Sequence, residues 1–144
     1  MPGAVLFACN HNAVRSPMAE AILKHLAGSR IYVESAGVRA GELDPFAAAV
    51  MEEIGIDLTQ HAPKSLDALN DRSFDLIVSL SPQAHHKALD LAQGFAVDVE
   101  YWPTPDPSLT DGSREQILDA YRNLRDTLFR KIKQRFKLAG GPSV

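Results

Sequence analysis

The sequence predicts an α/β fold with three layers, in which a four-stranded parallel sheet carries helices on both faces. Short apolar runs alternate with amphipathic stretches along the chain, which is typical of parallel strands joined by crossover helices. Turn signals recur at short intervals, and no linker-like stretch interrupts the 144 residues. We therefore expect one domain over residues 1–144. Ligands bind such sheets beyond the carboxyl ends of the strands.

The first strand and the first helix are clearly marked. Residues 4–8 form a short, uninterrupted apolar run, as in a buried parallel strand. A helix is expected to follow, with Ser16 as its N-terminal cap, Pro17 in its first turn and Gly28 as its stop. The loop between this strand and this helix then lies at the ligand-binding edge of the sheet.

The middle of the chain continues the alternation of strands and helices. The strands are marked by apolar or alternating residues, and the two longer helices end close to Gly55 and Gly94, which suit helix stops. In chain order we expect a strand at 31–34, a helix at 45–54, a short helix at 65–69, a strand at 74–80, a helix at 82–91 and a strand at 96–102.

A long final helix is expected over residues 113–138, and residues 139–144 are expected to fray. Apolar side chains recur at helical spacing and form one face of this helix. These side chains are Ile117, Tyr121, Leu124, Leu128 and Ile132.

Composition excludes several functional classes. The net charge of −3 argues against a nucleic-acid partner or a membrane-surface partner. No apolar run approaches the length of a membrane span. A single cysteine excludes an internal disulfide and favours a reducing compartment, so a cytoplasmic location is expected. The oligomeric state is not indicated by any pattern.

The loop after the first strand, residues 9–16 (CNHNAVRS), carries the predicted chemistry. Its backbone N–H groups can converge on one point that also faces the N-terminus of the following helix, which suits a tetrahedral oxyanion. Arg15 can grip two oxygens of that anion with its planar fork, and Cys9 lies in line for attack. The residues expected to cradle the anion with Arg15 are Asn10, His11, Asn12, Ala13 and Val14.

The surroundings of Cys9 favour its thiolate form. A thiolate that attacks phosphorus forms a phosphocysteine, which water then hydrolyses. Ser16 can donate its hydroxyl to the sulfur and make it a better leaving group. Alternatively, Cys9 is a buried and inert cysteine at the end of a strand.

Asp106 is the candidate general acid that protonates the leaving group. It follows the fourth strand, at the same edge of the sheet as the cysteine loop, and prolines flank it on both sides. Alternatively, Asp106 only begins a turn. Its position next to the cysteine loop favours the role of an acid.

These residues resemble the low-molecular-weight protein tyrosine phosphatase superfamily, which includes thiol-linked arsenate reductases. The resemblance covers residues 4–137. It rests on Cys9 followed by Arg15-Ser16, on Ser35-Ala36-Gly37, on Gly55-Ile56-Asp57-Leu58 with His61, on the strand beginning Phe74-Asp75, and on Asp106-Pro107.

The resemblance implies a two-step phosphatase reaction that uses no metal and no cofactor. It makes Cys9 the nucleophile, Arg15 the phosphate clamp and Asp106 the general acid, with Asn12 and Ser16 supporting the loop. It also implies a substrate mouth beside the loop after Gly37. There we expect Val38, Arg39 and Phe46, with Glu42 nearby.

Three functions remain open. The first is hydrolysis of a phosphomonoester, from a tyrosine-phosphorylated protein or a small aryl phosphate. The second is reduction of arsenate by an external small-molecule thiol, because His11 replaces the glycine that the phosphatases usually have, and Ser108 replaces the usual aromatic residue. The three-cysteine reductase mechanism is excluded by the single cysteine. The third is binding of an oxyanion or phosphopeptide without turnover.

Overall fold

The computed structural model describes residues 2–69 and 73–138. Its centre is a sheet of four parallel strands in the order β2-β1-β3-β4. The strands are β1 (Ala4–Cys9), β2 (Tyr32–Gly37), β3 (Leu76–Ser79) and β4 (Asp98–Tyr101). The predicted four-stranded parallel sheet is therefore confirmed.

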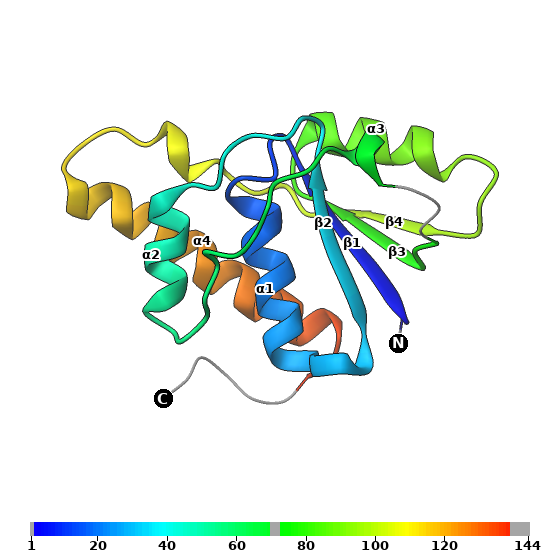
Figure 1. Ribbon diagram of the computed structural model, residues 1–144, viewed down its shortest axis with the longest axis horizontal. Coiled ribbons are helices and arrows are strands. Elements are labelled where there is room, and N and C mark those ends of the chain that lie inside the picture. The colour runs from blue at the N-terminus through cyan, green and yellow to red at the C-terminus, as the bar shows by residue number, and fades with distance from the viewer. Residues whose placement is uncertain (1, 70–72, 139–144) are drawn as a thin grey trace.

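Four α-helices cover the sheet. They are α1 (Arg15–Ala27), α2 (Pro45–Glu52), α3 (Pro82–Ala92) and α4 (Arg114–Arg135). Helix α3 lies apart from the other three, which gather on the opposite side of the sheet (Figure 1). Three short 3₁₀ helices complete the fold: η1 (Gly28–Arg30), η2 (Leu66–Ala68) and η3 (Pro107–Leu109).

The central strand β1 separates two cores because its side chains alternate between the faces of the sheet. Val5, Phe7 and Cys9 belong to the larger core, which also holds residues of α1, α2 and α4. Leu6 and Ala8 belong to the smaller core, under α3. Cys9 thus enters the larger core at the end of a strand that is buried on both faces.

Some element boundaries differ from those expected. Strand β2 continues through Ser35-Ala36-Gly37 because this segment pairs with the end of β1. Helix α1 begins at Arg15, with Val14 at the N-cap and no capping side chain, so Ser16 lies inside the first turn. Gly28 does end α1, at a φ of 60°. The expected fraying of residues 139–144 lies outside the described residues.

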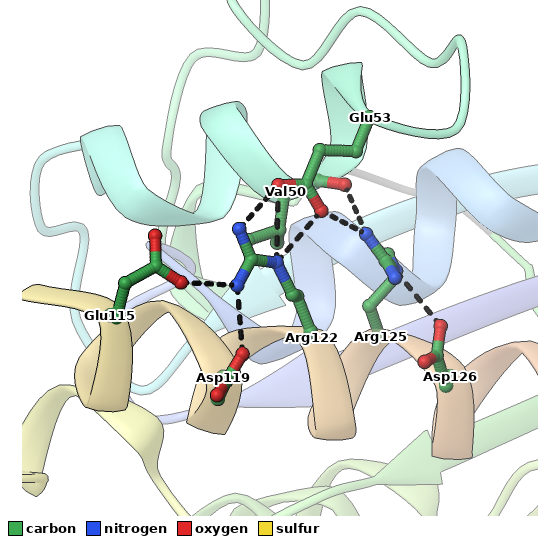
Figure 2. A network of polar contacts seen from close by, with 7 residues as sticks. All are labelled: Val50, Glu53, Glu115, Asp119, Arg122, Arg125 and Asp126. Carbon is green, nitrogen blue, oxygen red and sulfur yellow. Dashed lines mark hydrogen bonds and ion pairs between the residues drawn. The ribbon is translucent and has the colours of Figure 1, made fainter.

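Helices α2 and α4 are joined by a network of charged side chains (Figure 2). Glu53, just after α2, accepts hydrogen bonds from Arg122 at 2.8–3.1 Å and from Arg125 at 2.8 Å. Arg125 is buried and also donates to the carbonyl of Val50 at 2.8 Å. Because α2 follows directly on one wall of the pocket described below, this network holds that wall against α4.

Glu53→Gln is expected to lower the free energy of unfolding by about 1 kcal/mol, because it weakens the pairing of the buried Arg125. The hydrogen bond from Arg122 is the largest influence that lowers the pKa of Glu53. The stabilisation is therefore present above the pKa of the unfolded chain and is lost as the pH falls through the lower folded pKa. Urea denaturation at neutral and acidic pH measures both effects.

Glu115→Gln is the matched control for that prediction. Glu115 contacts only Arg122 within this network, and its side chain is 74% exposed. We expect its loss to change the free energy of unfolding by less than half as much. Equal effects of the two substitutions at neutral pH would show that Glu53 does not join α2 to α4.

Candidate active site

The cysteine loop lies at the carboxyl edge of the sheet, between β1 and α1. The carbonyls of Cys9, Asn10 and His11 accept hydrogen bonds of 2.7–2.9 Å from backbone N–H groups of the segment 38–41. The carbonyl and the N–H of a trans peptide point in opposite directions. The N–H groups that follow these carbonyls therefore point away from that segment, as a cradle for an anion requires.

Gly37 allows the loop to lie this close to the end of β2. A Cβ at residue 37 would lie 2.5 Å from the carbonyl oxygen of Arg39 and 2.6 Å from the backbone nitrogen of Asn12. Both contacts are with backbone atoms, so no side-chain rotation relieves them. Only glycine fits at this position without moving the loop.

Gly37→Ala is expected to displace the loop, to reduce turnover by about 100-fold and to lower the free energy of unfolding by about 1–3 kcal/mol. Turnover assays and urea denaturation measure the two effects. Gly3→Ala is the control, since its Cβ meets only the side-chain oxygen of Asp75, at 3.3 Å. A Gly37→Ala variant with normal turnover would show that the loop has room to move.

Asn12 is the buried brace of the loop. Its φ of 53° is left-handed, which asparagine tolerates better than most residues. Its amide nitrogen donates to the hydroxyls of Ser16 and Ser35, both at 2.9 Å. Its amide oxygen accepts from His61 at 2.9 Å and from the backbone N–H of Lys64 at 3.0 Å. The side chain is thus held on all sides and fixes the unusual backbone conformation.

This arrangement directs the hydroxyl of Ser16 towards the thiol. The Ser16 oxygen accepts from Asn12, and two acceptors lie within reach of its own proton: the Cys9 sulfur at 2.9 Å and the Ala36 carbonyl at 3.5 Å. The shorter distance favours donation to the sulfur. A proton donated to a sulfur stabilises its thiolate. Ser16 therefore contacts the candidate nucleophile, and the expectation that it caps α1 is wrong.

Behind Asn12 lies a buried polar group made of Glu20, Ser35 and His61. Ser35 donates to Glu20 at 2.5 Å, and Glu20 also pairs with Lys24. Burial lowers the pKa of His61, and the nearby charge of Glu20 partly opposes this effect. The Nε2–H of His61 donates to the Asn12 amide oxygen, and its Nδ1 lies 3.8 Å from Glu20.

The guanidinium of Arg15 is buried and linked to the loop after β4. Only 6% of the residue is exposed, and Nη1 donates to the carbonyl of Thr104 at 2.9 Å. The Thr104 hydroxyl in turn donates to the carbonyl of Leu80 at 3.1 Å. Arg15 is therefore held in one orientation before any anion arrives.

Asp106 lies on the wall of the same pocket. Its Oδ1 accepts from the backbone N–H of Ser108 at 3.0 Å and from the Ser108 hydroxyl at 2.6 Å. The residue also caps the short helix η3. The structure thus shows the turn that was the alternative interpretation of Asp106, and it places this turn beside Cys9 and Arg15.

The pocket has a volume of about 270 Å³. It brings together three of the predicted catalytic residues, with Ser16 beneath Cys9. Asn10 and Asn12 do not line it. The Asn10 side chain instead accepts from Ser81 at 2.6 Å. The pocket is lined by Cys9, His11, Ala13, Val14, Arg15, Glu42, Leu43, Asp44, Pro45, Asp106 and Ser108.

Of the residues expected at the substrate mouth, Glu42 is in the pocket lining, whereas Val38, Arg39 and Phe46 are not. Val38 packs against the smaller core, and the exposed Arg39 is not part of the pocket lining. Phe46 is half-buried and packs on Tyr121, with ring centroids 5.5 Å apart, and the Arg114 guanidinium lies 5.3 Å from the centre of its ring. The apolar surface of Phe46 is better covered against α4 than at a water-filled entrance. Residues 42–45 form this wall of the pocket instead.

Asp44 and Tyr121 are residues of the site region that the sequence reasoning missed. The Tyr121 hydroxyl donates to Asp44 at 2.6 Å, and Asp44 caps α2 by accepting from Phe46 N at 2.8 Å. The backbone N–H of Asp44 also donates to the carbonyl of Ala13 in the cysteine loop, at 3.2 Å. An Asp-Pro pair before an apolar stretch is a helix-start signal that could have identified this cap.

Residues 2–69 and 73–138 contain neither a group of metal-ligating side chains nor a membrane-spanning helix. Within these ranges, no group of three or more His, Cys, Asp or Glu side chains is arranged to hold a metal ion. None of the helices found there is both long and apolar enough to cross a membrane.

Comparison with known proteins identifies the family. The family model for low molecular weight phosphotyrosine protein phosphatase matches residues 4–138. Glutaredoxin arsenate reductase from Synechocystis sp. is 37% identical over 131 residues, which cover 90% of this chain and 92% of that protein.

Solved structures of both branches have the same fold. An arsenate reductase in the phosphate-binding state is similar with a TM-score of 0.72 and 26% identity, covering 94% of this chain and 98% of its own. The low molecular weight protein tyrosine phosphatase from T. tengcongensis has a TM-score of 0.76 and 26% identity, covering 93% and 97%. The chain belongs to the low molecular weight phosphotyrosine protein phosphatase family.

Proposed function

We propose that this protein reduces arsenate, with Cys9 as the nucleophile and an external small-molecule thiol as the reductant. The observation that carries the proposal is the pocket itself. Cys9 and the fixed Arg15 face a space of about 270 Å³, and no aromatic side chain is among its described lining residues. A phenyl phosphate group gains much of its binding energy from aromatic contact, whereas a small tetrahedral oxyanion needs none.

The similarity to arsenate reductases supports this choice. Glutaredoxin arsenate reductase is 37% identical to the chain, and the arsenate reductase in the phosphate-binding state matches nearly its whole length. The predicted phosphatase activity is supported by the family model and by the solved phosphatase from T. tengcongensis. Since arsenate and phosphate have the same tetrahedral shape and charge, the cradle suits both.

The first step forms a bond between sulfur and arsenic. The Cys9 thiolate attacks arsenic, the As–O bond opposite to it breaks, and the departing oxygen leaves as water after it takes up protons. Asp106, on the pocket wall, is the group that supplies a proton. Arg15 and the loop N–H groups stabilise the negative charge on the remaining oxygens. Arsenic is still pentavalent in this adduct.

The second step needs a thiol from outside the chain, because the sequence contains no other cysteine. The external thiolate attacks the Cys9 sulfur, and the sulfur–arsenic electron pair moves to arsenic, which leaves as trivalent arsenite. A mixed disulfide remains on Cys9. A second thiol molecule then attacks the external sulfur and releases a disulfide and the free Cys9 thiolate. Two thiols are oxidised for each arsenate reduced.

The test is formation of arsenite from arsenate, in the presence of a panel of small thiols and with no other protein. We expect arsenite to accumulate in proportion to the enzyme and to the oxidised thiol. Hydrolysis of p-nitrophenyl phosphate is measured in parallel. Oxyanion binding with neither product would identify the protein as a binder without turnover.

Phosphomonoester hydrolysis is the second candidate, and the position of Asp106 is the observation that favours it. A carboxyl group beside the nucleophile can protonate an alkoxide or phenolate leaving group. In this case water, rather than a thiol, attacks the covalent adduct on Cys9. Rapid hydrolysis of p-nitrophenyl phosphate without arsenite formation would favour this candidate over the first.

Asp106→Asn is expected to slow the hydrolysis of different aryl phosphates to different extents. Phenyl phosphate has a poor leaving group, so its turnover should fall by about 100-fold or more, whereas p-nitrophenyl phosphate should lose much less. The comparison of kcat for the two esters isolates proton donation from binding. An equal loss on both esters would exclude Asp106 as the acid. Ser108→Ala, which alters the neighbouring turn but keeps the carboxyl group, is the control.

A further inference from the structure

The walls of the pocket carry an excess of negative charge. Glu42, Asp44 and Asp106 contribute three carboxyl groups, and Arg15 is the only lysine or arginine among the described lining residues. His11, which is exposed, is the other basic side chain of the lining. A pocket that holds an oxyanion at its base therefore has an acidic entrance.

Two of these carboxyl groups are fixed in place. Asp44 accepts from the Tyr121 hydroxyl and from the backbone N–H of Phe46. Asp106 is fixed by Ser108. Burial raises the pKa of Tyr121, and its hydrogen bond to Asp44 and the charges of Asp44 and Asp106 raise it further, so the phenol keeps its proton. Neither carboxylate can turn away from an incoming molecule without losing these hydrogen bonds.

The charge of Arg15 does not offset this acidity once an oxyanion is bound. Its guanidinium is buried at the base, against the Thr104 carbonyl, where it faces the anion. A bound arsenate group neutralises Arg15 and the N-terminal end of α1. Asp106 has by then given up its proton in the first step. A second reactant that enters after arsenate therefore meets carboxylates, and the exposed His11 is the only basic side chain besides Arg15 among the described lining residues.

From this distribution of charge we infer that the thiol that completes the reaction carries no net negative charge. The inference rests on the proposed function and names the class of its second substrate. A neutral or cationic thiol approaches the Cys9 adduct without repulsion, whereas an anionic thiol, including a tripeptide thiol with two carboxylates and one ammonium group, is repelled. Charges within a Debye length of one another change encounter rates substantially at low salt.

The first experiment measures kcat/KM for three small thiols in arsenate reduction: cysteamine, 2-mercaptoethanol and 3-mercaptopropionate. Each value is divided by the rate of the same thiol with an uncharged small disulfide, which removes differences in intrinsic reactivity. We expect the normalised kcat/KM to be highest for the cationic thiol, intermediate for the neutral thiol and lowest for the anionic thiol. The highest and lowest values should differ by about tenfold at low salt and by less at high salt. Equal normalised values, or the reverse order, would overturn the inference.

Glu42→Gln tests whether the entrance is responsible. Glu42 is exposed and lines the pocket. Its neutralisation should reduce the ratio of cationic to anionic rates at least twofold. Glu52→Gln is the matched control, because it removes the same charge from an exposed position on α2 that is not in the lining. An unchanged ratio in Glu42→Gln, or an equal change in both variants, would overturn the inference.

A second readout does not depend on arsenate reduction. Cys9 is the sole cysteine of the chain, so mass spectrometry follows its reaction with symmetrical disulfides directly. The thiolate attacks one sulfur, the S–S bond breaks, and the other half leaves as a thiolate. Because Arg15 carries no bound oxyanion in this assay, the test compares variants rather than reagents. We expect Glu42→Gln to raise the rate with dithiodipropionate relative to cystamine, after division by the rates for the urea-unfolded chain, and Glu52→Gln to leave that ratio unchanged.

The two readouts separate the failure of each proposal. If Cys9 discriminates between disulfides by charge but no thiol supports arsenite formation, the proposed reduction is refuted. The acidic entrance would then still select reactants by their charge. If arsenite forms but neither assay depends on the charge of the reactant, the proposed reduction stands and the inference about the charge of the thiol is overturned.

Discussion

Cys9→Ser is expected to abolish arsenite formation and phosphate-ester hydrolysis, with a loss of about 10⁴-fold or more, while oxyanion binding survives. A serine hydroxyl keeps its proton at neutral pH and is a far weaker nucleophile than a thiolate. The cradle is built from other groups: the loop N–H groups and Arg15. Turnover assays and phosphate titration by calorimetry measure the two properties separately.

Mass spectrometry adds a direct check on the same variant. The wild-type chain trapped during turnover should carry a covalent adduct on Cys9, and Cys9→Ser should carry none. Ser16→Ala is the informative companion, because it keeps the nucleophile and removes the hydroxyl 2.9 Å from the sulfur. The Ser16→Ala variant should still turn over substrate, but more slowly than the wild-type chain. Turnover by Cys9→Ser above a few per cent of wild type would show that Cys9 is not the nucleophile.

Arg15→Lys is expected to reduce kcat by about 100- to 1000-fold and to weaken oxyanion binding. The planar guanidinium donates to the Thr104 carbonyl and still offers its other N–H groups to an anion. A lysine ammonium keeps the charge and loses the fork, so it cannot serve both partners in the same geometry. Steady-state kinetics and phosphate titration measure the two losses.

Arg39→Lys is the control for that substitution. Arg39 is exposed and does not line the pocket, so the same chemical change there should leave kcat within about twofold. Should Arg15→Lys retain most of the wild-type kcat, positive charge alone would be sufficient, and bidentate contact would not be the function of Arg15.

The sheet and the cysteine loop could be predicted because local signals specify them. A buried parallel strand reads as a continuous apolar run, and residues 4–8 are one. The loop follows from the offset between Cys9 and Arg15 and from the strand and helix on either side. These features depend on neighbours in sequence, so one chain without an alignment is sufficient to find them.

The support of the loop could not be predicted, because it is made by contacts across long sequence separations. His61 and Lys64 reach Asn12 from about 50 residues away. Gly37 is needed because two loops cross there, which no local pattern indicates. Ser16 resembles a helix cap in sequence, and the structure instead turns its hydroxyl to the thiol.

The wall of the pocket at residues 42–45 could be predicted only in part: Glu42 is expected near the entrance and lines the pocket, whereas Phe46 is expected there and does not line it. Phe46 is an aromatic residue near the expected entrance, but burial against Tyr121 stabilises it more than exposure to water would. Tyr121 was counted only as part of an apolar face. Its hydroxyl also fixes Asp44 on the pocket wall, a role that depends on the packing of α4 against α2.

The most direct test of the account is the product formed from arsenate by the purified chain with a neutral thiol, with Cys9→Ser in parallel. The account predicts one arsenite for every two thiols oxidised, with no product from Cys9→Ser. A wild-type chain that binds phosphate and hydrolyses p-nitrophenyl phosphate, but forms no arsenite with any thiol, would contradict it.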